Sequence, residues 1–569
     1  MEQFNGHFTS IDWCVLIGYF AATLCIGLYF WKKSRSTEGF TAAGRSLPGW
    51  LVGISIFATY LSSISYLAYP GKSFAGNWNP FMFALSIPFA TWIAVRWFVP
   101  YYRESGDVSA YSNLEHRFGS WARLYAGVFY LLTQLARIGV VTYLLALPMS
   151  VIFGWNIITL ILITGISVTF YTFIGGIVAV IWTDAIQTVV LLLGAVVAVI
   201  VLLCTIDQPV AALCSAWTDW KFSLGNPGVT ADTKGNLTFQ FGGATALVII
   251  LYGFADNLKN FGIDQSYVQR YQTAKNEKEA KRSLWLGAIL YIPVSAMFFL
   301  IGTLLFILYH HGANSAEDLN EVRHITAYQQ LLQSGVEPEY VVDAAGKKHF
   351  TNDFQKILNE RAATLSDTVI GDRIFPHFIG KYLPPGLTGL LIAAIFSAGM
   401  STISGSLNSS ATLLLRDYYQ RFIRPDASEK ESMLVLYCGT IIWGILGTGV
   451  ALLLVKLTDS ALDIWWTLVG VFGGGMLGLF LIGMCIKRAG NAAAVFGVSI
   501  GTLFIFWMTI PRLTKWLELH NAAETANVFR SLAEHCGGLS PFHDNMIPVF
   551  GTAIMLAAAF LAVCFSRRK

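Results

Sequence analysis

The chain has 569 residues, of which 55% are hydrophobic and only 13% are charged, and its formal net charge is +4. Soluble domains carry roughly a quarter charged residues, so this composition excludes a soluble globular protein and predicts an all-α polytopic protein embedded in the lipid bilayer. The basic residues form no patch suited to nucleic acid, and the eight cysteines show no metal-binding or disulfide spacing.

Apolar stretches long enough to cross about 30 Å of hydrocarbon predict about 13 transmembrane helices. The first stretch follows an acidic and polar start without a cleavage site, so we expect a retained helix and not a signal peptide. The predicted spans lie near residues 11–31, 48–70, 79–100, 121–153, 156–177, 180–204, 241–262, 284–310, 385–416, 432–456, 461–486, 491–511 and 545–565.

Every second connection between these spans is basic, which predicts an N-terminus outside the cell and a C-terminus in the cytoplasm. The long hydrophilic connections at 205–240 and 311–384 then fall outside. The basic connections include Lys32, Arg35, Arg103, Lys275, Lys281, Arg416 and Arg567.

The topology allows two blocks of five helices that start on opposite sides of the membrane, at 48–204 and at 241–486. Such blocks form the inverted repeat of secondary transporters. We therefore expect one transport domain over 1–569, in which 1–47 adds a first helix and loop, 311–384 is an external insertion, and 487–569 adds two helices.

The first helix of the first block carries Ser62, Ser63 and Ser65 at mid-span, and the 385–416 span carries Ser401 and Thr402 on one helical face. Hydroxyl-rich segments can support a discontinuous helix, whose free carbonyls need partners that lipid cannot supply. They can equally allow close helix packing. Both interpretations stay open from these segments alone.

The first helix of the second block is interrupted by the polar residues Asp256, Asn257, Lys259 and Asn260. Two interrupted helices in corresponding positions indicate a transporter binding site. The polar run could also be the cytoplasmic end of a helix emerging into water.

Arg137 lies near the centre of the 121–153 span, where an arginine costs at least ~2.5 kcal/mol. We expect no acidic residue deep in the other spans, so the anion facing Arg137 is predicted to belong to a substrate, with carbonyl groups and water as the alternative. Asp184, at the start of the 180–204 span, is either a helix cap or a cation ligand.

Several spaced motifs resemble the sodium/solute symporter family, and the resemblance covers roughly residues 11 to 511. It implies a leucine-transporter-type fold with a five-plus-five inverted repeat and alternating access. The motifs are Tyr171-Thr-Phe-Ile-Gly175-Gly176 with Val180-Ile-Trp182-Thr183-Asp184, then Gln269-Arg270-Tyr271, then Leu407-Asn408-Ser409-Ser410-Ala411-Thr412.

The resemblance implies a main sodium (Na⁺) site with carbonyl and hydroxyl ligands, and in some members a further sodium site. Gly405 stands where those members usually supply another hydroxyl. The main site would use Ala58, Leu61, Ala398, Ser401 and Thr402, and the further site Asp184, Ser401 and Ser404.

Within the family, Arg137 with Ser62 and Ser65 is similar to bacterial sialic acid symporters, in which an arginine and hydroxyls hold the sugar carboxylate. Tyr60 replaces a smaller hydroxyl residue of that group. Asn257 and Asn260 complete the substrate-binding set that we expect.

We therefore expect a sodium-coupled symporter that imports an acidic sugar such as sialic acid, acting as a monomer in a bacterial inner membrane. A neutral sugar or a monocarboxylate is the alternative substrate, and a transporter-like receptor or sensor is the alternative class. The sequence shows no nucleophile and base pair that would indicate an enzyme.

Overall fold

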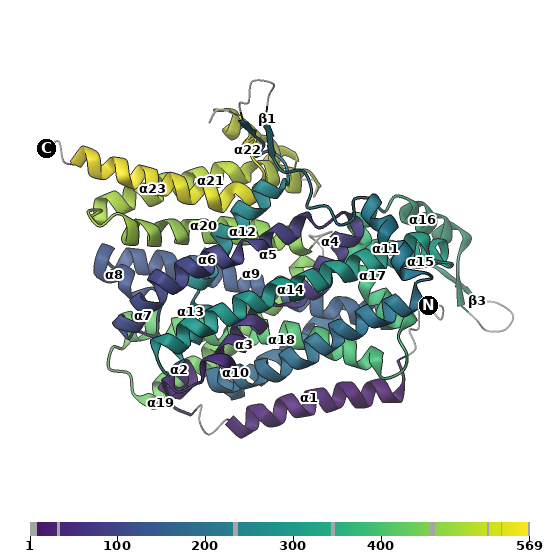
Figure 1. The fold of residues 1–569 in the computed structure, drawn as a ribbon, viewed down its shortest axis with the longest axis horizontal. Coiled ribbons are helices and arrows are strands. Elements are labelled where there is room, and N and C mark those ends of the chain that lie inside the picture. The colour runs from purple at the N-terminus through teal and green to yellow at the C-terminus, as the bar shows by residue number, and fades with distance from the viewer. Residues whose placement is uncertain are drawn as a thin grey trace.

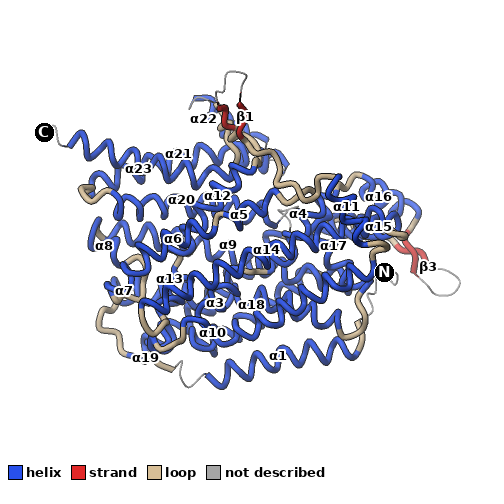
Figure 2. The backbone as a smooth tube through the Cα atoms, viewed as in Figure 1, coloured by secondary structure: helices blue, strands red, loops and turns tan. Residues whose placement is uncertain are grey.

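The computed structural model describes residues 8–30, 35–231, 237–342, 348–455, 461–519, 523–535 and 538–566. The long helices run side by side in one bundle, and the short strands lie at its periphery (Figures 1 and 2). Helix α1 begins at the end of the bundle that carries α15 and α16, whereas α23 ends at the opposite end (Figure 1). The start of α1 and the end of α23 therefore lie at opposite ends of the bundle.

Within the described residues, eleven helices are long and apolar enough to cross a membrane, or twelve if one bent pair counts as a span. The expected number of about 13 is not confirmed, because Ile157–Phe170 is a shorter apolar helix. The spans contain α1 (Ser10–Phe30), α3 (Gly49–Tyr60) with η4 (Ile64–Ala68) and α4 (Tyr69–Ala75), then η5 (Asn79–Phe81), α5 (Met82–Leu85), α6 (Ile87–Ile93), η6 (Ala94–Phe98) and α7 (Val99–Ser105) in one span, α9 (Ser120–Phe153), α10 (Ile157–Thr205), α12 (Ala246–Ile263), α14 (Glu277–His311), α18 (Leu387–Leu413) with η7 (Leu414–Ile423), α19 (Glu429–Leu454), α20 (Ala461–Cys485), α21 (Asn491–Leu519), and η8 (Asp544–Met546) with α23 (Ile547–Ser566).

The helix that opens the first predicted block is discontinuous. α3 ends at Tyr60, Leu61 is extended, and the axis bends by 57° before η4 and α4 continue. The Ser62 hydroxyl accepts a hydrogen bond of 3.1 Å from the Ile64 N–H and so serves the new helix start. The expected interruption among the serines of the 48–70 span is confirmed.

A second interruption separates α12 from α13 (Gln265–Gln272). Asp264 is extended, with φ −73° and ψ 118°, and its carboxylate accepts the Ser266 N–H at 2.9 Å as the N-cap of α13. The polar residues of α12 that precede it are all buried. The interpretation of this run as a helix end emerging into water is therefore wrong.

Helix α10 has two arms that meet at Gly176, whose φ of 53° and ψ of −174° interrupt the helical backbone. Glycine tolerates this positive φ because it has no Cβ. The two spans expected at 156–177 and 180–204 correspond to these arms. Helix α18 packs against α10, α9, α19 and α1 and is mostly buried.

The connections hold shorter elements, including two antiparallel strand pairs. Strand β1 pairs with β2 with Val229 opposite Phe239, and β3 pairs with β4 with Tyr340 opposite Phe350. The remaining elements are α2 (Thr37–Ala42), η3 (Ala43–Arg45), α8 (Ser112–Phe118), α11 (Pro209–Thr218), β1 (Val229–Ala231), β2 (Leu237–Phe239), α15 (Ser315–Gln333), β3 (Tyr340–Val342), β4 (Lys348–Phe350), α16 (Asn352–Ala363), α17 (Asp367–Tyr382) and α22 (Ala523–His535).

Lys221, in the connection before β1, anchors that connection to the end of α4. Its ammonium group donates to the carbonyls of Phe74 at 2.8 Å and Gly76 at 3.1 Å and lies 3.5 Å from the centre of the Phe306 ring. Burial lowers the pKa of Lys221 to about 8.

Candidate functional site

The break after α3 faces the middle of α18. The Thr402 hydroxyl lies 3.3 Å from the Thr59 carbonyl and 3.2 Å from the Ala398 carbonyl of its own helix. The Ser401 hydroxyl is buried beside the Asp184 carboxylate. A helix that ends at Tyr60 also leaves its last carbonyls without regular helical partners. Uncharged oxygens of this kind suit a small desolvated cation.

The five residues predicted for the main sodium site are therefore divided between two elements that meet. Ala58 and Leu61 lie at the end of α3, whereas Ala398, Ser401 and Thr402 lie within one turn of α18, and all five are buried. The donor set at this junction fits a sodium ion. The role of each residue as a ligand stays a prediction.

Asp184 lies well inside the second arm of α10, eight residues beyond Gly176, and is fully buried. Its Oδ2 accepts hydrogen bonds from the Ser55 hydroxyl and from Arg270 Nη2, the latter at 3.3 Å. The interpretation of Asp184 as a helix cap is therefore wrong. Ser404, expected beside it in a further sodium site, donates to the Ser401 carbonyl at 3.1 Å.

Arg137 has an acidic partner inside the protein. Its Nη2 lies 3.4 Å from Asp264 Oδ2, which also accepts from Gln134 Nε2 at 3.2 Å. The guanidinium also lies over the rings of Tyr267 and Trp465, at 5.8 and 5.3 Å from their centroids. The expectation that no protein carboxylate faces Arg137 is wrong, because the chain continues past the predicted end of the 241–262 span and folds Asp264 back into the bundle.

Tyr60 lies in an aromatic cluster at the same break. Its ring centroid is 4.7 Å from that of Tyr291 and 5.6 Å from that of Tyr267. Because Tyr267 also contacts Arg137, the cluster and the buried arginine form one continuous region. Asn260 Nδ2 lies 3.3 Å from the Tyr60 hydroxyl, so these two predicted substrate residues meet.

Asn260 also connects this region to a buried ion pair on α12. Its Nδ2 donates to Asp256 Oδ2 at 3.0 Å, and Asp256 Oδ1 lies 2.6 Å from the Lys259 ammonium. Both charged side chains are buried. The pair therefore places no net charge beside Tyr60.

The other predicted substrate residues have different surroundings. Asn257 Nδ2 donates to the Ser86 hydroxyl at 2.9 Å and to the Phe83 carbonyl at 3.3 Å, which directs it toward the end of α5. Ser62 lies at the break and Ser65 in the turn that follows, and both are buried.

Sequence reasoning missed several residues of this region, namely Ser55, Asp264, Tyr267 and Trp465. Asp264 and Tyr267 belong to a stretch that hydropathy places beyond a span end, although Asp264 before Ser266 is a typical N-cap pattern. Ser55 and Trp465 carry no local signal, because each becomes relevant only through its contact with a distant arginine.

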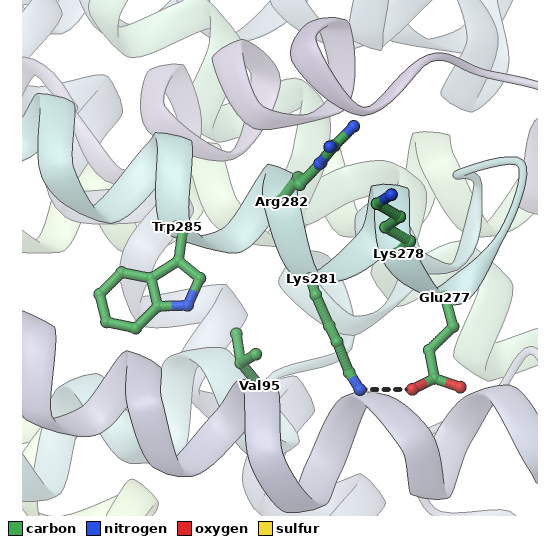
Figure 3. Close-up of a pocket in the computed structure, with 6 residues that line it drawn as sticks. All are labelled: Val95, Glu277, Lys278, Lys281, Arg282 and Trp285. Atoms are coloured by element: carbon green, nitrogen blue, oxygen red, sulfur yellow. Dashed lines mark ion pairs between the residues drawn. The ribbon is translucent and has the colours of Figure 1, made fainter.

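A surface cavity of about 650 Å³ lies at the start of α14, and none of its lining residues belongs to the broken helices (Figure 3). Three basic side chains of α14 line it, of which Lys281 is paired with Glu277 and Arg282 with Glu279. Basic groups with a tryptophan are typical of the membrane surface. The lining consists of Val95, Glu277, Lys278, Lys281, Arg282 and Trp285.

Comparison with known proteins identifies similar chains. A family model described as the sodium:solute symporter family matches residues 40–331 and 346–501. The sodium/sialic acid symporter SiaT of Proteus mirabilis is 30% identical over 512 residues, covering 88% of this chain and 89% of the relative. The sodium/sialic acid symporter NanT of Aliivibrio fischeri is 29% identical over 503 residues, covering 88% of each chain.

A solved structure is also similar along nearly the whole chain. It is described as the substrate-bound outward-open state of a Na⁺-coupled sialic acid symporter, with a TM-score of 0.76, 27% identity and coverage of 98% of both chains. The likeness confirms the expected all-α fold of the leucine-transporter type.

Proposed function

We propose that this chain imports a small carboxylated sugar of the sialic acid class. The chain belongs to the sodium:solute symporter family, and it is a sodium-coupled symporter and not an enzyme. The observation that carries the proposal is Arg137, which is buried in the bundle beside Tyr267 and Trp465. An arginine keeps its proton under all relevant conditions, and its planar fork matches a carboxylate.

The names of the relatives support an acidic sugar as the substrate, because both bacterial symporters and the solved structure are described as sialic acid symporters. The aromatic cluster around Tyr60 supports a substrate with an apolar ring face, since sugar rings pack on aromatic side chains through their C–H groups. Asn260 and the Tyr60 hydroxyl would then bind hydroxyl groups of the sugar.

In the proposed cycle, a sodium ion binds between the end of α3 and the middle of α18. The ion links two elements that must separate when the site opens toward the cytoplasm, so its binding favours the outward-open state. Its release inside weakens that link and frees the substrate. Coupling is reciprocal, so the substrate tightens sodium binding by the factor by which sodium tightens substrate binding.

The cycle fits a topology in which the blocks 48–204 and 241–486 move against each other. We propose an N-terminus outside the cell and a C-terminus in the cytoplasm, because the basic connections alternate along the chain. We further propose that one chain contains a complete pathway and acts as a monomer in a bacterial inner membrane.

Uptake into proteoliposomes tests the proposal. With an inward sodium gradient, sialic acid should accumulate, whereas a neutral sugar and a short monocarboxylate should not. Arg137→Gln should abolish accumulation, whereas Arg282→Gln, which removes an exposed guanidinium at the start of α14, should not. Accumulation of the neutral sugar alone, or of sialic acid by Arg137→Gln, would refute the assigned substrate class.

A further inference from the structure

The cavity at the start of α14 lies between two membrane helices. One wall is α14, which contributes Lys278, Lys281, Arg282 and Trp285, and the other is η6, which contributes Val95. In Figure 3, Val95 lies between the side chains of Trp285 and Lys281. The volume of about 650 Å³ leaves room for a charged group larger than a water molecule.

The side chains of this cavity carry an excess of positive charge. Lys281 is paired with Glu277 and Arg282 with Glu279, and Lys278 adds a third cation to these two pairs. All three cations lie in the first two turns of α14, where the positive end of the helix dipole disfavours them. Both pairs are partly exposed, and exposed pairs are weak. An anion can therefore bind here in place of a carboxylate.

The cavity lies at the depth of a membrane surface. Helix α14 has 35 residues, which extend over about 52 Å, whereas the hydrocarbon layer is about 30 Å thick. Arg282 is its last charged residue before an apolar run, so the boundary passes close to Trp285. On the helix opposite, the exposed Trp92 and Trp97 pack edge to face with ring centroids 5.3 Å apart. Exposed tryptophans of this kind mark the level of the lipid headgroups.

Both walls continue from the headgroup level into the hydrocarbon with exposed apolar side chains. On α14, Ile289 lies one turn beyond Trp285 and is 57% exposed. On α6, Phe89 lies about one turn beyond Trp92 and is 64% exposed. A soluble anion would leave this apolar continuation uncovered, whereas a phospholipid has a phosphate for the cations and acyl chains for the apolar side chains.

We propose that the cavity at the start of α14 binds one anionic phospholipid, with the phosphate among Lys278, Lys281 and Arg282 and the acyl chains along Trp285 and the exposed face of α6. The orientation of a chain in the membrane requires basic residues, but it requires neither a cavity between them nor a tryptophan at its edge. A zwitterionic lipid carries its own cation, which these three cations repel, so the site selects an anionic headgroup. The proposal holds whichever solute the chain transports.

Native mass spectrometry of the purified full chain in detergent tests the proposal. The chain should retain one copy of phosphatidylglycerol under conditions that remove phosphatidylcholine. Lys278→Gln/Lys281→Gln removes two of the three cations and should weaken phosphatidylglycerol binding roughly 30-fold, since each cation near a membrane surface contributes about fivefold. Arg424→Gln/Lys430→Gln is the matched control, because it removes two exposed charges beside the start of α19, and it should leave binding unchanged.

Equal retention of the two lipids by the wild-type chain, or an equal loss of phosphatidylglycerol in both double variants, would overturn the proposal. Inorganic phosphate separates a lipid from a soluble anion. Release of the bound phosphatidylglycerol by millimolar phosphate would indicate a soluble-anion site and would also overturn it.

A photoreactive phosphatidylglycerol gives a readout that needs no variant and decides the question if Lys278→Gln/Lys281→Gln does not fold. Its label should appear on the segment of α14 around Trp285 and on α6. Labelling confined to other helices would show that the lipid binds elsewhere and would overturn the assigned site.

Discussion

Replacing Asp264 by asparagine isolates the charge that faces Arg137. The asparagine side-chain oxygen can still accept the Ser266 N–H that begins α13. The amide nitrogen that takes the place of Oδ2 cannot accept from Gln134, so the variant loses that hydrogen bond together with the negative charge 3.4 Å from the Arg137 guanidinium. The variant therefore tests whether Asp264 neutralises the buried Arg137 guanidinium, which would otherwise pair with a substrate carboxylate.

The magnitude follows from the distance and the burial. Two unit charges 3.4 Å apart interact by roughly 5 kcal/mol at an effective dielectric constant of 20, and removing one partner of a buried pair typically destabilises a protein by about 3–5 kcal/mol. We expect Asp264→Asn to lower the free energy of unfolding by about 3 kcal/mol. A substrate carboxylate no longer competes with Asp264, so its affinity should rise roughly tenfold to a hundredfold.

Unfolding in detergent, followed by tryptophan fluorescence, measures the first effect, and calorimetric titration with sialic acid in sodium buffer measures the second. A double-mutant cycle with Arg137→Gln isolates the pair. Asp367→Asn, which disrupts a partly exposed pair with Arg323, is the control and should change stability by less than about 1 kcal/mol. An equal loss of stability from Asp264→Asn in the Arg137→Gln background would refute the pairing.

Three further changes test other parts of the structure. Ser401→Ala should raise the sodium concentration for half-maximal binding about tenfold, because it removes one ligand, whereas Thr440→Ala on α19 should not. Gly71→Ala should lower the free energy of unfolding by about 1–3 kcal/mol, because its Cβ would lie 2.7 Å from the backbone of α17. Gly18→Ala is the control: its Cβ would meet no atom within 4 Å, so the free energy of unfolding should not fall. Burial lowers the pKa of Lys221 to about 8, so the unfolded chain binds more protons above that pH. The free energy of unfolding should therefore rise by roughly 2 kcal/mol from pH 8 to 10 relative to Lys221→Met, measured by urea titration.

The broken helices could be predicted from sequence because their cause is local. Ser62, Ser63 and Ser65 interrupt an apolar span, and free carbonyls at membrane depth need polar partners. The structure places the break at these serines. The kink of α10 at Gly176 follows the same logic, since a Gly-Gly pair separates two apolar stretches.

The charge pairing could not be predicted, because it depends on contacts between residues far apart in the chain. Arg137 and Asp264 are 127 positions apart, and Arg270 and Asp184 are 86 apart. Hydropathy ended the predicted span before Asp264 and so treated that carboxylate as lying outside the membrane. A hydropathy window cannot show that a chain turns back into the bundle after a helix has ended.

The three buried pairs explain why ion and substrate should bind together. Asp184 with Arg270, Asp256 with Lys259 and Asp264 with Arg137 leave the region around the two breaks without net charge. One sodium ion alone would add a positive charge to this buried region, and one carboxylate alone would add a negative charge. Because isolated charges are unfavourable in a low-dielectric interior, each ligand lowers the electrostatic cost of binding the other. One sodium ion with one carboxylated sugar restores neutrality, whereas a neutral sugar gains nothing from this effect. The strength of coupling should therefore follow the charge of the substrate and should be lost when its carboxylate is esterified.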